Sequence, residues 1–150
     1  MEKIFRSVAL VQKSEGDKSR LLLRWSAGES CWVFVVADRL NKESFRESVT
    51  REVAWQLNLK RQSDFLVSNM AQLSMEYVET MSNETQRHVA IAFYNVHIYR
   101  RNVLESLAQD TSSRWVSAQD VCRGRTNDEQ TIHPQIVDWI NKWSVVQPWQ

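Results

Sequence analysis

The sequence predicts an α/β domain in which helices cover both faces of a mixed β-sheet. Its hydrophobic periodicity changes several times between the spacing of strands and the spacing of helices. A strand-like segment at 88–99 is apolar on both of its sides, as in a central strand that is covered on both faces. The chain has 150 residues, of which 43% are hydrophobic and 25% charged, so we expect a single domain over residues 1–150.

The first elements are strands separated by polar turns. Residues 3–12 and 20–25 have strand-like composition and flank a polar turn that contains Gly16. A third apolar run, 31–37, follows another turn and is expected to be one strand.

A helix is predicted next. Ser44, followed three residues later by Glu47, has the pattern of a capping box, so the helix is expected from Ser44 to about Leu57. One side of this helix is apolar and should face the core, with Phe45, Val49, Val53 and Leu57 on it.

The second half of the chain returns to strands before it ends in a helix. Residues 65–81 are expected to form one long strand or two short ones, and the 82–85 segment forms a turn before the central strand. A short segment at 114–121 and a loop at 122–130 precede a terminal helix over 134–144, which starts at a proline. The residues that this helix presents to the core are Ile136, Trp139, Ile140 and Trp143.

Composition excludes several classes of function. Nineteen basic and eighteen acidic residues give a net charge of +1. We therefore expect neither electrostatic binding of DNA or RNA nor membrane association. The three glycines, Gly16, Gly28 and Gly124, are too far apart for a phosphate-binding loop. Cys31 and Cys122 lack the spacing of a metal site, and with no signal peptide in evidence a reduced cytoplasm is the expected compartment.

The segment from position 37 to 59 resembles the Nudix box, G-x5-E-x7-R-E-U-x-E-E-x-G-U, in which U is a bulky aliphatic residue. Five of the nine fixed positions match, and they are occupied by Glu43, Arg51, Glu52, Val53 and Leu59. The other four positions differ, and they hold Ala37, Trp55, Gln56 and Asn58. The order of strands and helices around the box also resembles the Nudix family, which implies an α/β/α sandwich.

The resemblance assigns roles to the residues of the box. Val53 and Leu59 would be structural, and Glu43 with Arg51 would form an ion pair that steadies the loop before the helix, although two solvated charges remain an alternative. In active Nudix enzymes the Glu of Arg-Glu and the Glu-Glu pair hold divalent cations. Here Glu52 is left as a residual metal ligand beside two residues without carboxylates, and no catalytic residue is assigned.

Four residues are candidates for binding a ligand. Trp55 and Trp32 offer aromatic rings for stacking or for lining a pocket, Gln56 offers an amide, and Arg24 could reach a phosphate. Each has a structural alternative: Trp55 could lie under a loop or at a subunit contact, Trp32 could be part of the core, and Arg24 could be a solvated charge at a sheet edge.

Three functions follow from the sequence. The favoured one is a Nudix-like domain that has lost metal-dependent hydrolysis and binds a nucleotide-like ligand or a protein partner, with no cofactor. The second is an active hydrolase of nucleoside diphosphate derivatives that uses Mg²⁺ or Mn²⁺ and recruits other ligands, such as Glu76, Glu79 or Glu84. The third is an interaction module, including a possible homodimer, that uses exposed aromatic residues such as Trp55 and Trp149.

Overall fold

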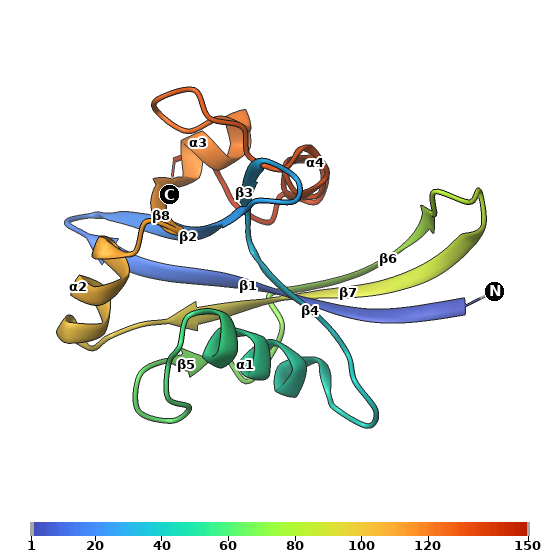
Figure 1. The fold of residues 1–150 in the computed structure, drawn as a ribbon, viewed down its shortest axis with the longest axis horizontal. Coiled ribbons are helices and arrows are strands. Elements are labelled where there is room, and N and C mark those ends of the chain that lie inside the picture. The colour runs from blue at the N-terminus through green and yellow to red at the C-terminus, as the bar shows by residue number, and fades with distance from the viewer. Residues whose placement is uncertain (1, 150) are drawn as a thin grey trace.

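A twisted eight-stranded sheet forms the middle layer of the molecule in the computed structural model, which describes residues 2–149 (Figure 1). The longest path of neighbours in the sheet runs β3-β2-β1-β7-β5, while β4 pairs with β1, β6 with β7 and β8 with β2. The strands are β1 (Glu2–Glu15), β2 (Lys18–Ser26), β3 (Cys31–Val33), β4 (Val35–Asp38), β5 (Leu66–Val67), β6 (Leu73–Thr80), β7 (Gln86–His97) and β8 (Ser113–Ser117).

The centre of the sheet is the pair β1 and β7. These strands run parallel from Glu2 opposite Arg87 to Gln12 opposite His97, and the other strand pairs are antiparallel, so the sheet is mixed. Both faces of β7 are buried, because Ile91 and Phe93 belong to one core and Ala92 to the other. The prediction of a central strand at 88–99 is therefore confirmed.

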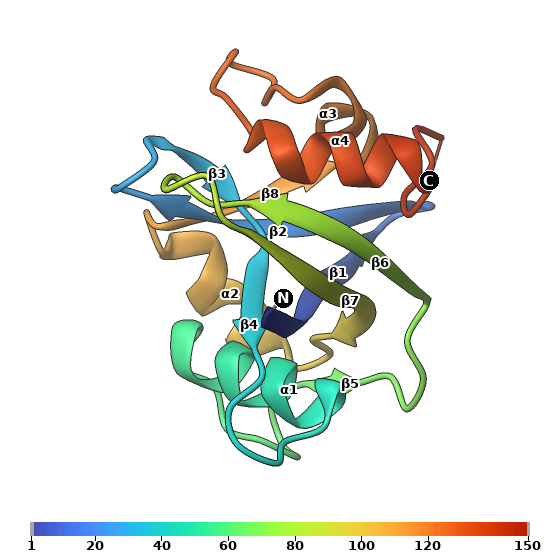
Figure 2. The same ribbon diagram turned by 90° about the vertical axis from the view of Figure 1, so that its right-hand side faces the viewer.

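Helices cover both faces of the sheet (Figures 1 and 2). On one face lie α1 (Phe45–Gln56) and α2 (Arg101–Gln109), and on the other lie α3 (Ala118–Arg123) and α4 (Pro134–Lys142). We call the two apolar layers the α1-side core and the α4-side core. The predicted mixed sheet with helices on both faces is confirmed.

The start of α1 follows from its capping box. The Ser44 hydroxyl accepts a hydrogen bond from the Glu47 backbone N–H at 3.1 Å, and the Glu47 carboxylate accepts one from the Ser44 backbone N–H at 2.9 Å. Val49 and Val53 are fully buried against the α1-side core. The phase of the helix therefore agrees with the predicted apolar stripe.

Three segments correct or refine the sequence prediction. Residues 31–37 are not one strand, because the chain divides at Phe34: β3 pairs with β2, whereas β4 pairs with β1. Residues 65–81 form two strands, β5 and β6. Helix α2 had no counterpart in the sequence prediction, and Arg100 at its N-cap makes no side-chain capping bond.

No helix within residues 2–149 is both long enough and apolar enough to cross a membrane.

Candidate functional site

A forked ion pair fixes the loop before α1. The Arg51 guanidinium donates to both carboxylate oxygens of Glu43, at 2.9 and 3.1 Å, and to the Asp38 carbonyl at 3.1 Å. Glu43 also accepts from the Leu40 backbone N–H and the Ser48 hydroxyl. The hydrogen bond from Arg51, followed by that from Leu40, lowers the pKa of Glu43 to about 2. Arg51 therefore pairs with Glu43, and Glu47 is used in the helix cap instead.

Glu52 lies one turn before the end of α1, and both of its carboxylate oxygens are engaged. Oε2 accepts a hydrogen bond from the Arg51 guanidinium at 2.6 Å, and Oε1 accepts one from the Gln56 side-chain amide at 3.0 Å. Because an ionised carboxylate can only accept, Gln56 presents its nitrogen to Glu52 and keeps its own oxygen for another donor. The charge of Glu52 is therefore compensated by the helix that carries it.

These donors do not fit a magnesium ion. Mg²⁺ prefers carboxylate and water oxygens in an octahedron, whereas the positions beside Glu52 hold an indole ring and an amide that turns its nitrogen toward the carboxylate. Two of the other acidic candidates are also paired: Glu79 with Arg6 and Arg87, and Glu76 with Lys3. Within residues 2–149, no three His, Cys, Asp or Glu side chains are grouped so that they could hold a metal ion.

Two hollows meet the last turns of α1. The outer hollow has a volume of about 590 Å³ and is lined by Arg51, Glu52, Ala54, Trp55 and Arg61. Trp55 is the most exposed tryptophan of the described chain, with 77% of its surface accessible, so the expectation that it could be buried under a loop is wrong.

The inner cavity lies between the chain around Phe34 and the start of α4. It has a volume of about 280 Å³, and its apolar wall is formed by Val33, Phe34, Val36, Ile136 and Trp139. Its polar and charged residues are Arg6, Ser26, Glu29, Gln56, His133 and Gln135. The hydrogen bond between Gln56 and Glu52 joins the two hollows, because Gln56 lines the inner cavity and Glu52 lines the outer one.

Arg6 lines the inner cavity and was not among the site residues predicted from the sequence. Its guanidinium binds Asp38 at 2.8 Å, the Tyr77 hydroxyl at 3.0 Å and Glu79 at 3.3 Å. Burial disfavours the charge on Arg6, but the hydrogen bond and charge of Asp38 outweigh burial and raise its pKa. A charged residue inside the apolar run "KIFRSVALV" was the signal that could have identified this network.

The helix-start residue His133 uses both of its ring nitrogens. The Nδ1 of His133 accepts from the Gln135 backbone N–H and so caps α4, while its Nε2 lies 2.5 Å from the Glu29 carboxylate. The pair links the start of α4 to the turn between β2 and β3 at the inner cavity. Nothing in the sequence spacing of these two residues indicated the contact.

The structure does not bring Arg24 and Trp32 to the end of α1. Arg24 donates to Asp110 at 2.8 Å and to the Ser113 hydroxyl at 2.6 Å, and so ties β2 to the chain after α2. Trp32 is only 6% exposed, and its indole N–H donates to the Gln130 side chain at 2.8 Å. Of the four predicted ligand-binding residues, Gln56 and Trp55 line the hollows beside α1.

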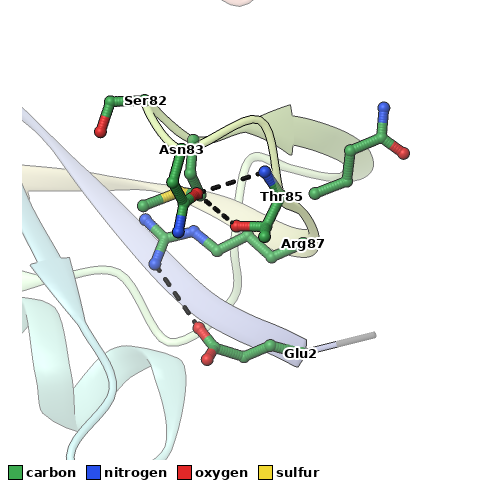
Figure 3. A pocket seen from close by; sticks show the side chains of 7 residues that line it. Glu2, Ser82, Asn83, Thr85 and Arg87 are labelled. Atoms are coloured by element: carbon green, nitrogen blue, oxygen red, sulfur yellow. Dashed lines mark hydrogen bonds and ion pairs between the residues drawn. The ribbon is translucent and has the colours of Figure 1, made fainter.

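Another hollow lies at the far end of the sheet, where the β6–β7 hairpin approaches the N-terminal strand. Figure 3 shows Arg87 and Glu2 pointing toward one another there, 3.6 Å apart, with the Asn83 side chain bonded to Thr85. Apart from Met81 its lining residues are polar or charged, and none of them was predicted from the box.

Comparison with known proteins gives no match by sequence, either to a family model or to a curated protein. Solved structures do match. An Ap4A hydrolase of C. elegans is 10% identical with a TM-score of 0.61, over 97% of this chain and 98% of that one. The Nudix hydrolase RenU of M. smegmatis is 14% identical with a TM-score of 0.57, over 93% of this chain and 84% of that one.

Another similar structure is that of NrtR of Shewanella oneidensis, solved in complex with a 27mer DNA. It is 11% identical with a TM-score of 0.61, over 93% of this chain and 61% of that one. At such low identity these matches establish the architecture rather than the chemistry. This chain has the fold of the Nudix hydrolases.

Proposed function

We propose that the chain is a Nudix-fold domain that binds a nucleotide-like ligand beside the last turn of α1 and does not hydrolyse it with a metal ion. The observation that carries this proposal is the state of Glu52, whose two oxygens are bonded to Arg51 and Gln56. By resemblance to the Nudix box, this is the position of a metal-binding carboxylate. A metal ion would have to displace a guanidinium and an amide there, without the help of neighbouring carboxylates.

The two hollows support ligand binding at this place. Ligand sites are concave, mostly apolar, and contain a few convergent polar groups. The inner cavity combines an aromatic and aliphatic wall with the amides of Gln56 and Gln135, and the outer hollow adds the ring of Trp55. The fold itself does not decide between hydrolysis and binding, because function resides in the site.

The proposal is tested by calorimetric titration of ADP into the protein, once in EDTA and once in excess magnesium. We expect the same affinity in both, and no release of phosphate or AMP during prolonged incubation. Hydrolysis of ADP, or of an ADP derivative, that requires magnesium and disappears in Glu52→Gln would overturn the proposal in favour of the metal-dependent hydrolase.

A further inference from the structure

The ring of Trp55 is exposed on the outer side of α1. Its accessible fraction of 77% compares with 7% for Trp139, which packs in the α4-side core. Along the described chain, the Trp55 ring has no stacking or cation–π partner. A single exposed tryptophan is common on protein surfaces, but the ring of Trp55 also borders a hollow of about 590 Å³.

The only uncompensated charge in the lining of the outer hollow, as far as the described residues go, is that of Arg61. Arg51 and Glu52 also line the hollow, but they are bonded to one another and to Glu43 and Gln56. The Arg61 guanidinium makes no hydrogen bond or ion pair within residues 2–149. The outer hollow therefore offers one aromatic face and one free cation with five N–H donors.

The inner cavity has the opposite character. Among residues 2–149, its lining contains one arginine, Arg6, which is bonded to two carboxylates, while His133 uses its Nδ1 to cap α4 and its Nε2 for Glu29. This lining therefore leaves no free cation for a phosphate. Its volume of about 280 Å³ is also small, since ligand pockets commonly have ~300 to 1,000 Å³. A phosphate would lose its hydration in this cavity without gaining a counter-charge.

We propose that the outer hollow binds a nucleotide, with the base stacked on Trp55 and a phosphate bonded to Arg61. This inference rests on the proposed function and assigns its ligand to one of the two hollows. Aromatic faces stack nucleobases of every kind, and the guanidinium fork matches the oxygens of a phosphate. Arg61 supplies the positive charge that a diphosphate needs where the side chains do not fit a metal ion.

In the first test, the tryptophan indoles of the protein are labelled with ¹⁵N and their NMR signals are monitored during titration. Three probes are added in separate titrations: ADP, adenosine and pyrophosphate. The Trp55 signal is assigned by its loss in Trp55→Phe. We expect ADP to shift this signal with the highest affinity, because only ADP engages both groups. Adenosine should shift it more weakly, and without the salt dependence of ADP.

Two variants with matched controls test the residues. Trp55→Ala should weaken ADP binding at least about fivefold, whereas Trp149→Ala, another exposed tryptophan, should leave it unchanged. Arg61→Gln should weaken ADP binding about fivefold and leave adenosine binding unchanged. Lys18→Gln, which removes an exposed charge at the start of β2, is its control. Trp55→Phe should retain part of the affinity because it keeps an aromatic face.

The outcomes separate this inference from the proposed function. If ADP binds with equal affinity to wild type and to both variants, and Val36→Phe abolishes binding by filling the inner cavity, the inference is wrong while the proposed function stands. If ADP does not bind the wild-type protein at all, the proposed function itself fails. If Trp55→Ala changes the sedimentation of the protein and ADP has no effect on Trp55, this surface contacts a second copy of the chain instead.

Discussion

The Glu43 carboxylate accepts hydrogen bonds from Arg51, from the Leu40 backbone and from Ser48, and thereby holds the turn that leads into α1. Its side chain is 22% exposed, so these bonds are partly shielded from water. Glu52, by contrast, has only Arg51 and Gln56 as side-chain partners within residues 2–149. The two acidic residues that match the Nudix box are therefore used differently: Glu43 organises a loop, and Glu52 joins two hollows.

The pKa of Glu43 predicts how stability depends on pH. It is lowered in the folded state from 4.5 to about 2, first by the hydrogen bond from Arg51 and next by that from Leu40. A carboxyl group with a lowered pKa contributes stability above its unfolded pKa and loses it as pH falls toward its folded pKa. Glu43→Gln should therefore lower the free energy of unfolding at neutral pH, and the difference from wild type should shrink between about pH 4.5 and 2.

Denaturant titrations at several pH values measure this difference. Glu105→Gln is the matched control, because Glu105 is 63% exposed and forms a surface ion pair with Arg101 on α2. A Glu43 variant that behaves like the Glu105 variant at every pH would show that the ion pair does not stabilise the loop.

Among the elements, α1 could be predicted best because its signals are local. Ser44 and Glu47 mark its start, and the spacing of Val49, Val53 and Leu57 marks its buried side. Helix α2 lacks such signals, since it has no side-chain cap and buries only Val103 and Leu107. The division of residues 31–37 was also hidden from local periodicity, because it depends on which neighbouring strand each half pairs with.

Val53 tests the phase of α1. Its side chain is fully buried in the α1-side core, so Val53→Ala should lower the free energy of unfolding by roughly 1–3 kcal/mol through lost burial and a small cavity. Trp55→Ala, on the exposed side of the same helix, should change it much less. Equal shifts of the denaturant midpoint for the two variants would contradict the observed orientation of the helix.

In the molecule as a whole, the last turns of α1 lie beside the outer hollow and the inner cavity. This arrangement could be predicted only in part from the sequence. The box register identified Glu52, Trp55 and Gln56 as neighbours. In the structure, Glu52 and Trp55 line the outer hollow, whereas Gln56 lines the inner cavity and is bonded to Glu52. Arg61 could not be selected, because its importance depends on which carboxylates lie nearby, whereas Arg6 was indicated only by its place inside an apolar run. Arg6 has two such partners and Arg61 has none among residues 2–149.

The central claim is that α1 lacks a fitting metal site because Trp55 and Gln56 take the places of two carboxylates. The most direct measurement is the melting temperature of wild type and of Trp55→Glu/Gln56→Glu, each with and without magnesium. Three neighbouring carboxylates repel one another and attract a divalent cation, so magnesium should raise the melting temperature of the double variant by about 3 °C and leave wild type unchanged. A comparable rise in wild type that Glu52→Gln removes would contradict the claim, and so would a folded double variant that does not respond to magnesium.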